Sequence, residues 1–246
     1  MPAYNEELRV EETVRNYAHF LNSCYSDIEV LVITDGCSDR TPQIVDELSK
    51  KYKCIKHIHP GKRLGKGGAV IEGFKAATGK VIGFVDSDGS TPAEDLHLLL
   101  NELSGCDGVI ASRWLSGSNV MKHEPPMRIV ASRGFNFLIK LLFGLPFNDT
   151  QCGAKFFKNE VIKDIITDLG LTDWSFDVEL LYVAHEKGYH LKEVPVKWEY
   201  KEGSKLNLRK VSINMLISII GFRIKKSPLA PLIPNRLAYI LYRKME

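Results

Sequence analysis

Short apolar runs alternate with amphipathic helical segments through the first half of the chain. The runs are rich in Val and Ile, and most end at a turn that contains Gly, Pro or Asp. Strands are expected at residues 28–33, 54–59, 81–85 and 108–111, and helical spacing occurs at 6–21, 42–51, 67–77 and 93–103. Alternation of this kind builds a parallel sheet with helices on both faces. We therefore expect a doubly wound, mostly parallel α/β fold that binds its ligand at the carboxyl ends of the strands.

The overall composition fits one such domain with a C-terminal extension. The chain has 246 residues, of which 44% are hydrophobic and 26% charged, and these values are ordinary for a globular protein. Its five cysteines are scattered and lack a Cys-x-x-Cys spacing, which argues against a disulfide or zinc framework and for reduced thiols in the cytoplasm. No apolar run in the sequence reaches the ~20 residues that a membrane-spanning helix needs.

Charge is distributed unevenly along the chain. Residues 1–186 carry 20 Lys and Arg against 26 Asp and Glu, whereas residues 187–246 carry 13 against 4. A basic tail on an acidic body indicates an anionic partner, either lipid headgroups or nucleic acid, although a merely solvated face gives the same pattern. We divide the chain into a domain of residues 1–206 and a basic, amphipathic membrane-interface tail of residues 207–246.

The N-terminus resembles a fold without its first strand. Residues 1–7 have the character of the turn that follows a strand, but no strand precedes them. The helix expected at residues 6–21 would then lack the strand from which its crossover starts. Either the chain starts late, which is the preferred interpretation, or the fold manages with one strand fewer.

Two aspartates one residue apart, Asp86 and Asp88, follow the apolar run 81–85. At the carboxyl end of a buried strand the two carboxylates can reach one divalent cation together. A cation held by one or two carboxylates and by substrate phosphates is the usual arrangement for Mg²⁺ and fits Mn²⁺. The alternative is an acidic turn that caps the next helix, with Ser90 or Thr91 as the N-cap.

Two further motifs fall at the same expected edge. The segment Gly65-Lys-Gly-Gly-Ala69 opens a helix, so that backbone N–H groups, the helix N-terminus and Lys66 can meet a phosphate. Asp35 follows another strand, where an acceptor side chain can bind the ribose or base of a nucleotide. A flexible glycine turn and an Asx-type turn are the alternatives. Together the three motifs trace a nucleotide diphosphate, from base through phosphates to metal.

The order of these motifs resembles that of family 2 glycosyltransferases of GT-A fold. The matching segments are Pro2-Ala-Tyr-Asn-Glu-Glu7, Asp35-Gly-Cys-Ser-Asp39, Gly65-Lys-Gly-Gly-Ala69, Asp86-Ser-Asp88, Asp149-Thr-Gln-Cys-Gly153, Trp174-Ser-Phe-Asp-Val-Glu-Leu-Leu-Tyr182 and Glu202-Gly-Ser-Lys-Leu206. The last three resemble the polyprenyl-phosphate branch, which includes dolichyl-phosphate β-glucosyltransferases and dolichol-phosphate mannose synthases. Mannose synthases tend to carry Asp-Ala-Asp-Leu-Gln, whereas Gly89 and Ser90 follow Asp88 here, as in the glucosyl branch. A third protein ligand for the metal therefore stays open.

The resemblance implies a donor site, a metal site and an acceptor site at one edge of the sheet. Its donor-binding residues are Pro2, Tyr4, Glu6, Asp35, Lys66, Gly67, Asp86 and Ser87. Its Mg²⁺ or Mn²⁺ ligands are Asp86 and Asp88. Its acceptor-binding residues are Arg113, Arg128, Arg133 and Lys205, and its catalytic residues are Asp88, Arg113 and Arg133. Asp177 and Glu179, in the helical segment 174–187, are expected to support the site, for example by orienting an arginine.

The implied chemistry needs cations more than it needs a base. Transfer of a hexose from a nucleotide sugar releases a diphosphate, whose developing charge a divalent metal can offset, and attack from the opposite face inverts the anomeric centre. An acceptor phosphate is already ionised near pH 7. Two unit charges ~4 Å apart repel by ~4 kcal/mol at an effective dielectric constant of ~20, so cationic residues must hold the two anions together. The planar fork of arginine suits that task.

Two apolar segments of 14 residues, 134–147 and 211–224, suggest contact with a membrane. As helices they would extend ~21 Å, which is short of the ~30 Å hydrocarbon core of a bilayer. Arg223, Lys225 and Lys226 accompany the second segment, so we expect it to lie in the interface near anionic lipid. The alternative is that both helices pack on the sheet as part of the core.

We therefore expect an inverting, metal-dependent hexosyltransferase that is peripheral to the cytoplasmic face of a membrane. Glucose from UDP-glucose is the preferred donor group and dolichyl or another polyprenyl phosphate the acceptor, with GDP-mannose as the alternative donor. The alternative from another class is a non-catalytic nucleotide- or nucleic-acid-binding module. The basic residues lack the interleaved aromatics that favour nucleic acid, so no nucleic-acid partner is expected. The oligomeric state stays open.

Overall fold

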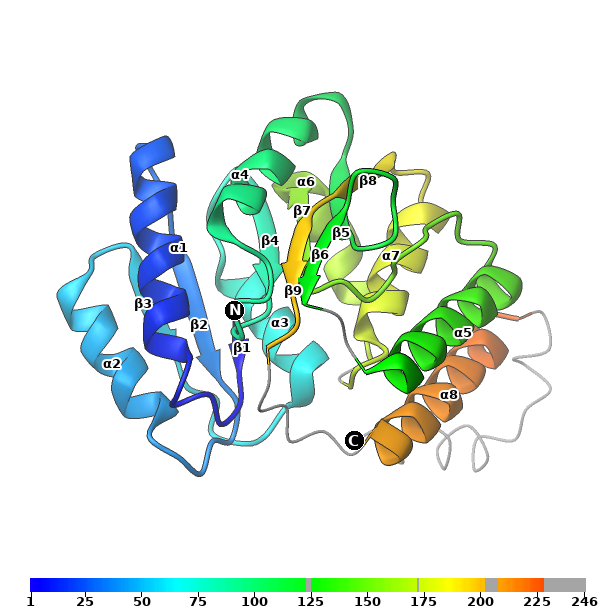
Figure 1. The fold of residues 1–246 in the computed structure, drawn as a ribbon, viewed down its shortest axis with the longest axis horizontal. Helices are drawn as coiled ribbons and strands as arrows, with labels where there is room; N and C mark the ends of the chain where they lie inside the picture. The colour runs from blue at the N-terminus through cyan, green and yellow to red at the C-terminus, as the bar shows by residue number, and fades with distance from the viewer. Residues whose placement is uncertain (123–124, 172, 202–207, 228–246) are drawn as a thin grey trace.

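The computed structural model describes residues 1–122, 125–171, 173–201 and 208–227 (Figure 1). The strands are β1 (Pro2–Ala3), β2 (Val30–Thr34), β3 (Ile55–Ile58), β4 (Val81–Val85), β5 (Gly108–Ser112), β6 (Asn119–Lys122), β7 (Ala154–Lys158), β8 (Leu191–Pro195) and β9 (Lys197–Glu199). The α-helices are α1 (Val10–Cys24), α2 (Thr41–Lys51), α3 (Gly65–Ala76), α4 (Ala93–Glu102), α5 (Pro126–Phe143), α6 (Asn159–Ile165), α7 (Phe176–Glu186) and α8 (Leu208–Lys225). Short 3₁₀ helices occupy Leu103–Gly105 and Ile166–Asp168.

The expected α/β alternation is confirmed, and the strand β2 shows why its sequence is uniformly apolar. Val30 and Val32 pack with α1 and α2 on one face of the sheet, whereas Leu31 and Ile33 pack with Ala69 of α3 on the other. Because successive side chains of a strand point to opposite faces, a strand covered on both sides is apolar at every position. Helices therefore cover both faces of the sheet, as the sequence predicts.

The strands form two main sheets and a small one. β1, β2 and β3 are parallel neighbours, and the second sheet has the order β4-β7-β5-β8. β5 and β8 are parallel, but β7 runs antiparallel to both β4 and β5. β6 and β9 form a separate parallel pair. The mostly parallel arrangement is as expected, whereas the reversed β7 and the division between β2 and β4 are features that the alternation pattern does not reveal.

A first strand is present, but it is only two residues long. Pro2 and Ala3 pair in parallel with Ile33 and Thr34 of β2, and the turn begins at Tyr4. The expectation that residues 1–7 hold only the turn is corrected for these two residues. Backbone pairing identifies the strand, because a two-residue strand is too short to show a hydrophobic period.

Helices α5 and α8 lie side by side at one end of the molecule (Figure 1). Their rings meet at Phe143 and Phe222, which are stacked with centroids 5.6 Å apart, and Ile219 is buried in the same core cluster. α5 ends at Gly144, whose positive φ of 66° allows the left-handed C-cap. One face of each helix therefore belongs to the core, so α8, which was expected within the tail, packs on the rest of the chain. Among the described residues, no helix is both long enough and apolar enough to cross a membrane.

Candidate active site

A cleft of about 870 Å³ opens at the carboxyl ends of β1, β2 and β4. This volume is typical of a small-molecule site. The three sequence motifs meet there, together with two arginines. Ten of the predicted site residues line it: Pro2, Tyr4, Glu6, Asp35, Lys66, Asp86, Ser87, Asp88, Arg113 and Arg128.

Asp86 and Asp88 come from the turn that ends β4. The backbone N–H of Asp86 donates to the Gly153 carbonyl at 2.8 Å, and Asp88 Oδ1 accepts the Ser90 backbone N–H at 2.9 Å. Gly89 between them has a positive φ of 72°, which lets the turn place both carboxylates at the cleft. The N-cap of α4 is Pro92 and makes no side-chain cap hydrogen bond. The alternative in which Ser90 or Thr91 caps this helix is therefore not what the structure shows.

Gly153 leaves the space that Asp86 occupies. A methyl group built on Gly153 would overlap the Asp86 carboxyl group, so only glycine fits beside this side chain. The motif Asp149-Thr-Gln-Cys-Gly153, for which the sequence suggested no role beyond resemblance, thus ends against the carboxylate pair. Its contribution arises from β7 lying next to β4, which the sequence pattern did not indicate.

The acidic groups at this end of the cleft influence one another. Burial raises the pKa of Asp86, and the raising effect of Asp88 adds to it, although Lys66 acts in the opposite direction. Burial also raises the pKa of Glu6, and the nearby Asp88 and Asp86 contribute, while Arg9 opposes the shift. Mutual repulsion between carboxylates is relieved by a cation between them.

The carboxylate pair fits a hard divalent cation. In the part of the chain that the structure describes, no group of three or more His, Cys, Asp or Glu side chains is placed to hold an ion. Asp86 and Asp88 supply two carboxylates on one cleft wall. Mg²⁺ typically takes one or two protein carboxylates and completes its shell with water and phosphate oxygens. The residues present therefore suit Mg²⁺ or Mn²⁺ that is shared with a diphosphate.

A buried network of two lysines and two aspartates adjoins the pair. Lys66 Nζ lies 3.1 Å from Asp86 Oδ1 and 3.3 Å from Asp177 Oδ2. Lys155 Nζ lies 2.5 Å from Asp177 Oδ1 and donates to the Cys152 carbonyl at 2.7 Å. Burial alone would lower the pKa of Lys66, but Asp177 and Asp86 more than offset it and raise the pKa. Burial would raise the pKa of Asp177, yet Lys155 and Lys66 lower it. All three groups are charged, and Lys66 is held at the metal end of the cleft.

The same network corrects one expectation and reveals one missed residue. The sequence suggests that Asp177 orients an arginine, whereas in the structure it binds Lys66 and Lys155. Lys155 is fully buried in β7, a position that pattern reasoning assigns to an apolar side chain. Glu179 accepts the backbone N–H groups of Gly170 and Leu171 at 2.8 and 2.6 Å and supports that loop instead of the cleft.

Replacing Lys155 with Met is expected to destabilise the fold strongly. The change would leave Asp177 buried with one cationic partner fewer, and breaking a buried ion pair in this way costs about 3–5 kcal/mol. Urea unfolding measures the free energy. Lys158→Met, on the same strand but in the exposed pair with Asp107, is the matched control and should change little. Equal effects of both substitutions would contradict a special role for the buried network.

Gly67 has a packing role. A methyl group built on it would come within 2.5 Å of the Leu171 carbonyl oxygen and 2.6 Å of Phe176 Cβ. Gly67 therefore lets α3 approach the start of α7, and it is not among the cleft-lining residues. Of the glycine-rich motif, Gly65 and Lys66 line the cleft.

The expected nucleoside pocket is formed by the β1–α1 turn and the loop before α3. Asp35 is buried, and its carboxylate accepts the backbone N–H groups of Leu64 at 2.5 Å and Gly65 at 2.8 Å. The Arg63 guanidinium carbon lies 4.0 Å from the Tyr4 ring centroid. Asp35 therefore fixes the loop that opens α3. Arg63 is a cleft residue that sequence reasoning missed, because only the fold brings it onto Tyr4.

Arg113 and Arg128 reach the cleft from the opposite side. Arg113 Nε and Nη2 donate to the two carboxylate oxygens of Asp149 at 2.8 and 3.0 Å, which fixes the plane of the guanidinium. Its carbon lies 5.1 Å from the Trp198 ring centroid, and that of Arg128 lies 5.4 Å from the Tyr200 ring centroid. Two aromatic-backed arginines thus share a wall of the cleft.

The other two predicted acceptor residues are placed differently. Arg133 is exposed on α5, lies 5.1 Å from the Trp114 ring centroid and is not among the residues that line the cleft. Lys205 lies outside the described residues. Trp174, which sequence reasoning did not single out, lines the cleft beneath the Lys66 ammonium, whose nitrogen is 5.1 Å from the ring centroid.

Comparison with known sequences gives a consistent result. The profile of Glycosyl transferase family 2 matches residues 1–166. Glycosyltransferase AglD of Haloferax volcanii is 36% identical over 212 residues, which are 85% of this chain and 34% of that protein. Dolichyl-phosphate beta-glucosyltransferases of Drosophila melanogaster and Homo sapiens are 34% and 32% identical over 220 residues, which are 84% of this chain and 68% of each of those proteins. The chain thus spans about one third of AglD.

Solved structures share the fold. Glucosyl-3-phosphoglycerate synthase from Mycobacterium tuberculosis, in complex with Mn²⁺, UDP and phosphoglyceric acid, has a TM-score of 0.67 at 15% identity, over 90% of this chain and 76% of that one. The mannosyltransferase PcManGT from Pyrobaculum calidifontis, with GDP-Man and Mn²⁺, has a TM-score of 0.61 at 18% identity, over 99% and 71%. These likenesses confirm the expected GT-A-type fold. With a family profile matching well over half of its length, the chain belongs to glycosyltransferase family 2.

Proposed function

We propose that this glycosyltransferase moves glucose from UDP-glucose to dolichyl phosphate or a related polyprenyl phosphate, with inversion at the anomeric carbon. The observation that carries the proposal is the arrangement of charge in one cleft. Asp86, Asp88 and Lys66 lie toward the β4 end, and Arg113 and Arg128 lie on another wall. Dolichyl-phosphate beta-glucosyltransferases among the relatives support the same donor group and acceptor.

The donor end suits a nucleoside diphosphate. Asp86 and Asp88 would hold Mg²⁺ or Mn²⁺, and Mn²⁺ accompanies nucleotide sugars in structures of the same fold. When bound, such an ion offsets the negative charge that develops on the departing diphosphate. Lys66 is held near this position by Asp86 and Asp177 and adds a fixed positive charge. Tyr4 and Arg63 offer a flat surface for the base.

The acceptor end suits an ionised phosphate. Because that phosphate is already a nucleophile near pH 7, the protein need not remove a proton from it. Its approach to the anionic donor is opposed by charge repulsion, which Arg113 and Arg128 would offset. Asp149 orients Arg113 before the acceptor arrives, so little reorganisation is required at binding.

A lipid acceptor requires the cleft to face a membrane surface, and α5 and α8 provide a suitable face. Along α5, an apolar stripe is formed by Met127, Val130, Phe137 and Leu141, whose exposed fractions range from 65% to 78%. Ile213, Leu216 and Ile220 are exposed on α8 beside it. Other residues of these two helices, including Phe135, Leu138 and Met215, line the cleft. We propose that this apolar face docks on the cytoplasmic surface of the membrane, so that the lipid tail can leave the cleft directly into it.

The double substitution Phe137→Ser with Leu141→Ser should weaken binding to vesicles of anionic phospholipid. Both side chains are exposed, so the fold should survive while apolar area available for insertion is lost. Sedimentation with vesicles measures the bound fraction, and Leu98→Ser on α4, remote from α5 and also partly exposed, is the control. Unchanged sedimentation of the double variant would place the membrane contact on another surface.

The donor and acceptor are tested together by product extraction. Radiolabelled UDP-glucose or GDP-mannose is incubated with the protein, Mg²⁺ and dolichyl phosphate, and label is counted in the organic phase. We expect lipid-linked label from UDP-glucose that requires both dolichyl phosphate and the metal. Label from GDP-mannose alone would assign the mannosyl alternative. Label that stays in water with a soluble phosphorylated acceptor would overturn the lipid acceptor.

A further inference from the structure

Two strand edges face each other across a gap in the middle of the fold. Within the described ranges, β4 pairs with β7 on one side and has no strand on its other side. β2 pairs with β3 from Val30 to Ile33, whereas β1 covers only Ile33 and Thr34 on the opposite edge. The backbone of β2 before Ile33 is therefore unpaired with any described strand on the side toward β4. Open edges of this kind bind further strands readily.

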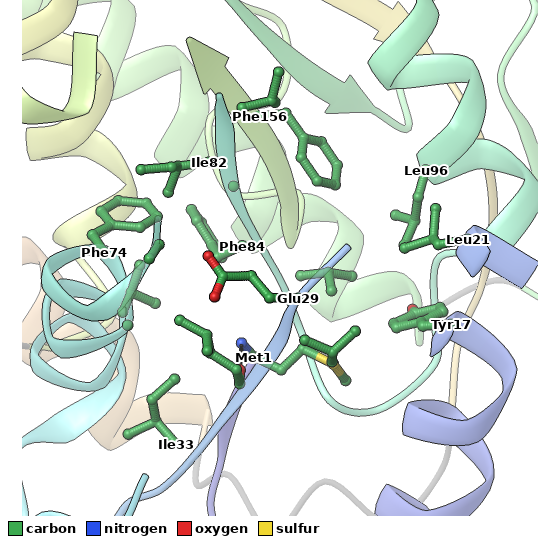
Figure 2. Close-up of a pocket in the computed structure, with 18 residues that line it drawn as sticks. Met1, Tyr17, Leu21, Glu29, Ile33, Phe74, Ile82, Phe84, Leu96 and Phe156 are labelled. Carbon is green, nitrogen blue, oxygen red and sulfur yellow. Dashed lines mark hydrogen bonds between the residues drawn. The ribbon is translucent and has the colours of Figure 1, made fainter. Parts of the chain in front are cut away.

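The gap between these edges is an apolar cavity, called here the strand slot (Figure 2). It holds about 120 Å³, roughly ten times what one water molecule needs. Figure 2 shows Phe74 on one side and Leu96, Leu21 and Tyr17 on the other, with Phe84 and Ile82 of β4 behind. Both sides of the slot are thus apolar, as they are around a central strand with two buried faces.

Met1 already occupies the first strand position of the slot. Its amino group donates to the Leu31 carbonyl at 2.8 Å, and its carbonyl accepts the Ile33 N–H at 2.9 Å. The Ala3 carbonyl accepts the Asp35 N–H at 3.0 Å, so the ladder repeats every two residues. By the same repeat, a residue two positions before Met1 would present its carbonyl to the Leu31 N–H.

The amino group itself fits this position poorly as a charge. Burial lowers the pKa of the Met1 amine to about 5, against the raising effect of Asp86. In a peptide bond the same nitrogen would carry no charge and would keep its hydrogen bond to Leu31. Extension of the chain at this nitrogen therefore removes an unfavourable buried group and continues an existing ladder.

We propose that the strand slot is a binding site for one further β-strand, namely an apolar extended segment of about five residues joined to Met1 and parallel to β2. Such a segment would pair with the open edge of β2, place alternate side chains on the two apolar sides and fill the cavity beside β4. Strand addition of this kind derives affinity from main-chain hydrogen bonds and specificity from the side-chain pockets. The slot selects β-branched apolar residues, because both faces of the strand are buried.

The test compares two extensions of the full chain. One places five residues alternating Val and Ile ahead of Met1, and the matched control places five alternating Ser and Gly there. We expect the first to raise the Tm by about 10 °C relative to the control and to slow hydrogen exchange at the Leu31 amide by at least tenfold. Neither readout depends on catalysis, so a failure here is distinct from a failure of the proposed reaction.

Three results would overturn the proposal. The first is equal Tm and equal Leu31 exchange in the two extended chains. The second is aggregation of the Val/Ile form without protection at Leu31, because a strand seated in the slot leaves no exposed edge. The third is protection at Leu31 only in a dimer, measured by light scattering, because this would assign the slot to a second copy of the chain.

Discussion

Asp88→Ala is expected to reduce glycosyl transfer by at least 10³-fold while the chain stays folded. Asp88 lies in a turn at the edge of the cleft and, with Asp86, supplies the two carboxylates that suit the metal. The loss of charge stabilisation on the leaving diphosphate would correspond to about 4 kcal/mol of the activation barrier. Initial rates with UDP-glucose and dolichyl phosphate measure the effect, with circular dichroism to check the fold.

The matched control is Asp107→Ala. Asp107 is also an acidic residue in a turn, but it pairs with Lys158 away from the cleft. Its substitution should leave the rate within about twofold of the parent, and its transfer should keep the same dependence on Mg²⁺. An Asp88→Ala variant that transfers glucose at the parent rate under limiting Mg²⁺ would remove Asp88 from the metal site.

Arg128→Ala is expected to lower kcat/KM for dolichyl phosphate by about 10- to 100-fold, because a hydrogen bond to a charged group contributes about 1.5–3 kcal/mol. Binding of UDP-glucose, measured by calorimetry, should change little, since Arg128 lies on α5, away from Lys66 and Asp86. Arg128→Lys keeps the charge but loses the planar fork and should show an intermediate defect. Slow hydrolysis of the donor by water should survive both changes, because water carries no negative charge.

Arg133→Ala is the matched comparison on the same helix. The resemblance implies a catalytic and acceptor role for Arg133, whereas the structure places it on the exposed side of α5 beside Trp114. We expect its substitution to harm transfer less than that of Arg128. The opposite order, with Arg133→Ala the more damaging, would return the acceptor phosphate to Arg133.

The sequence by itself determined the fold class and the donor end of the site. An apolar run that ends at Asp86, and another that ends before Asp35, places each carboxylate where a strand leaves the sheet. Because parallel strands share one carboxyl edge, local patterns sufficed to bring Asp35, Lys66, Asp86 and Asp88 to one cleft. This inference needed only strand direction and order along the chain, both of which periodicity reports.

Contacts between segments distant in sequence could not be predicted in that way. Lys155 and Asp177 are 22 residues apart and meet because β7 runs antiparallel between β4 and β5. A lysine in an apolar strand has no local signal that its partner is buried beside it. Gly153 similarly reveals its purpose only when β7 brings it against Asp86.

Tertiary structure also decided which arginine faces the cleft and where the sheet is open. Arg128 and Arg133 are five residues apart, so on a helix they point roughly 140° from each other and cannot share one wall. Both positions look alike in the sequence, and packing of α5 against α8 fixes which one turns inward. The strand slot follows from the absence of a described strand between β2 and β4, a property of pairing in space. Sequence periodicity thus reports which face of an element is apolar, whereas only packing reports what that face meets.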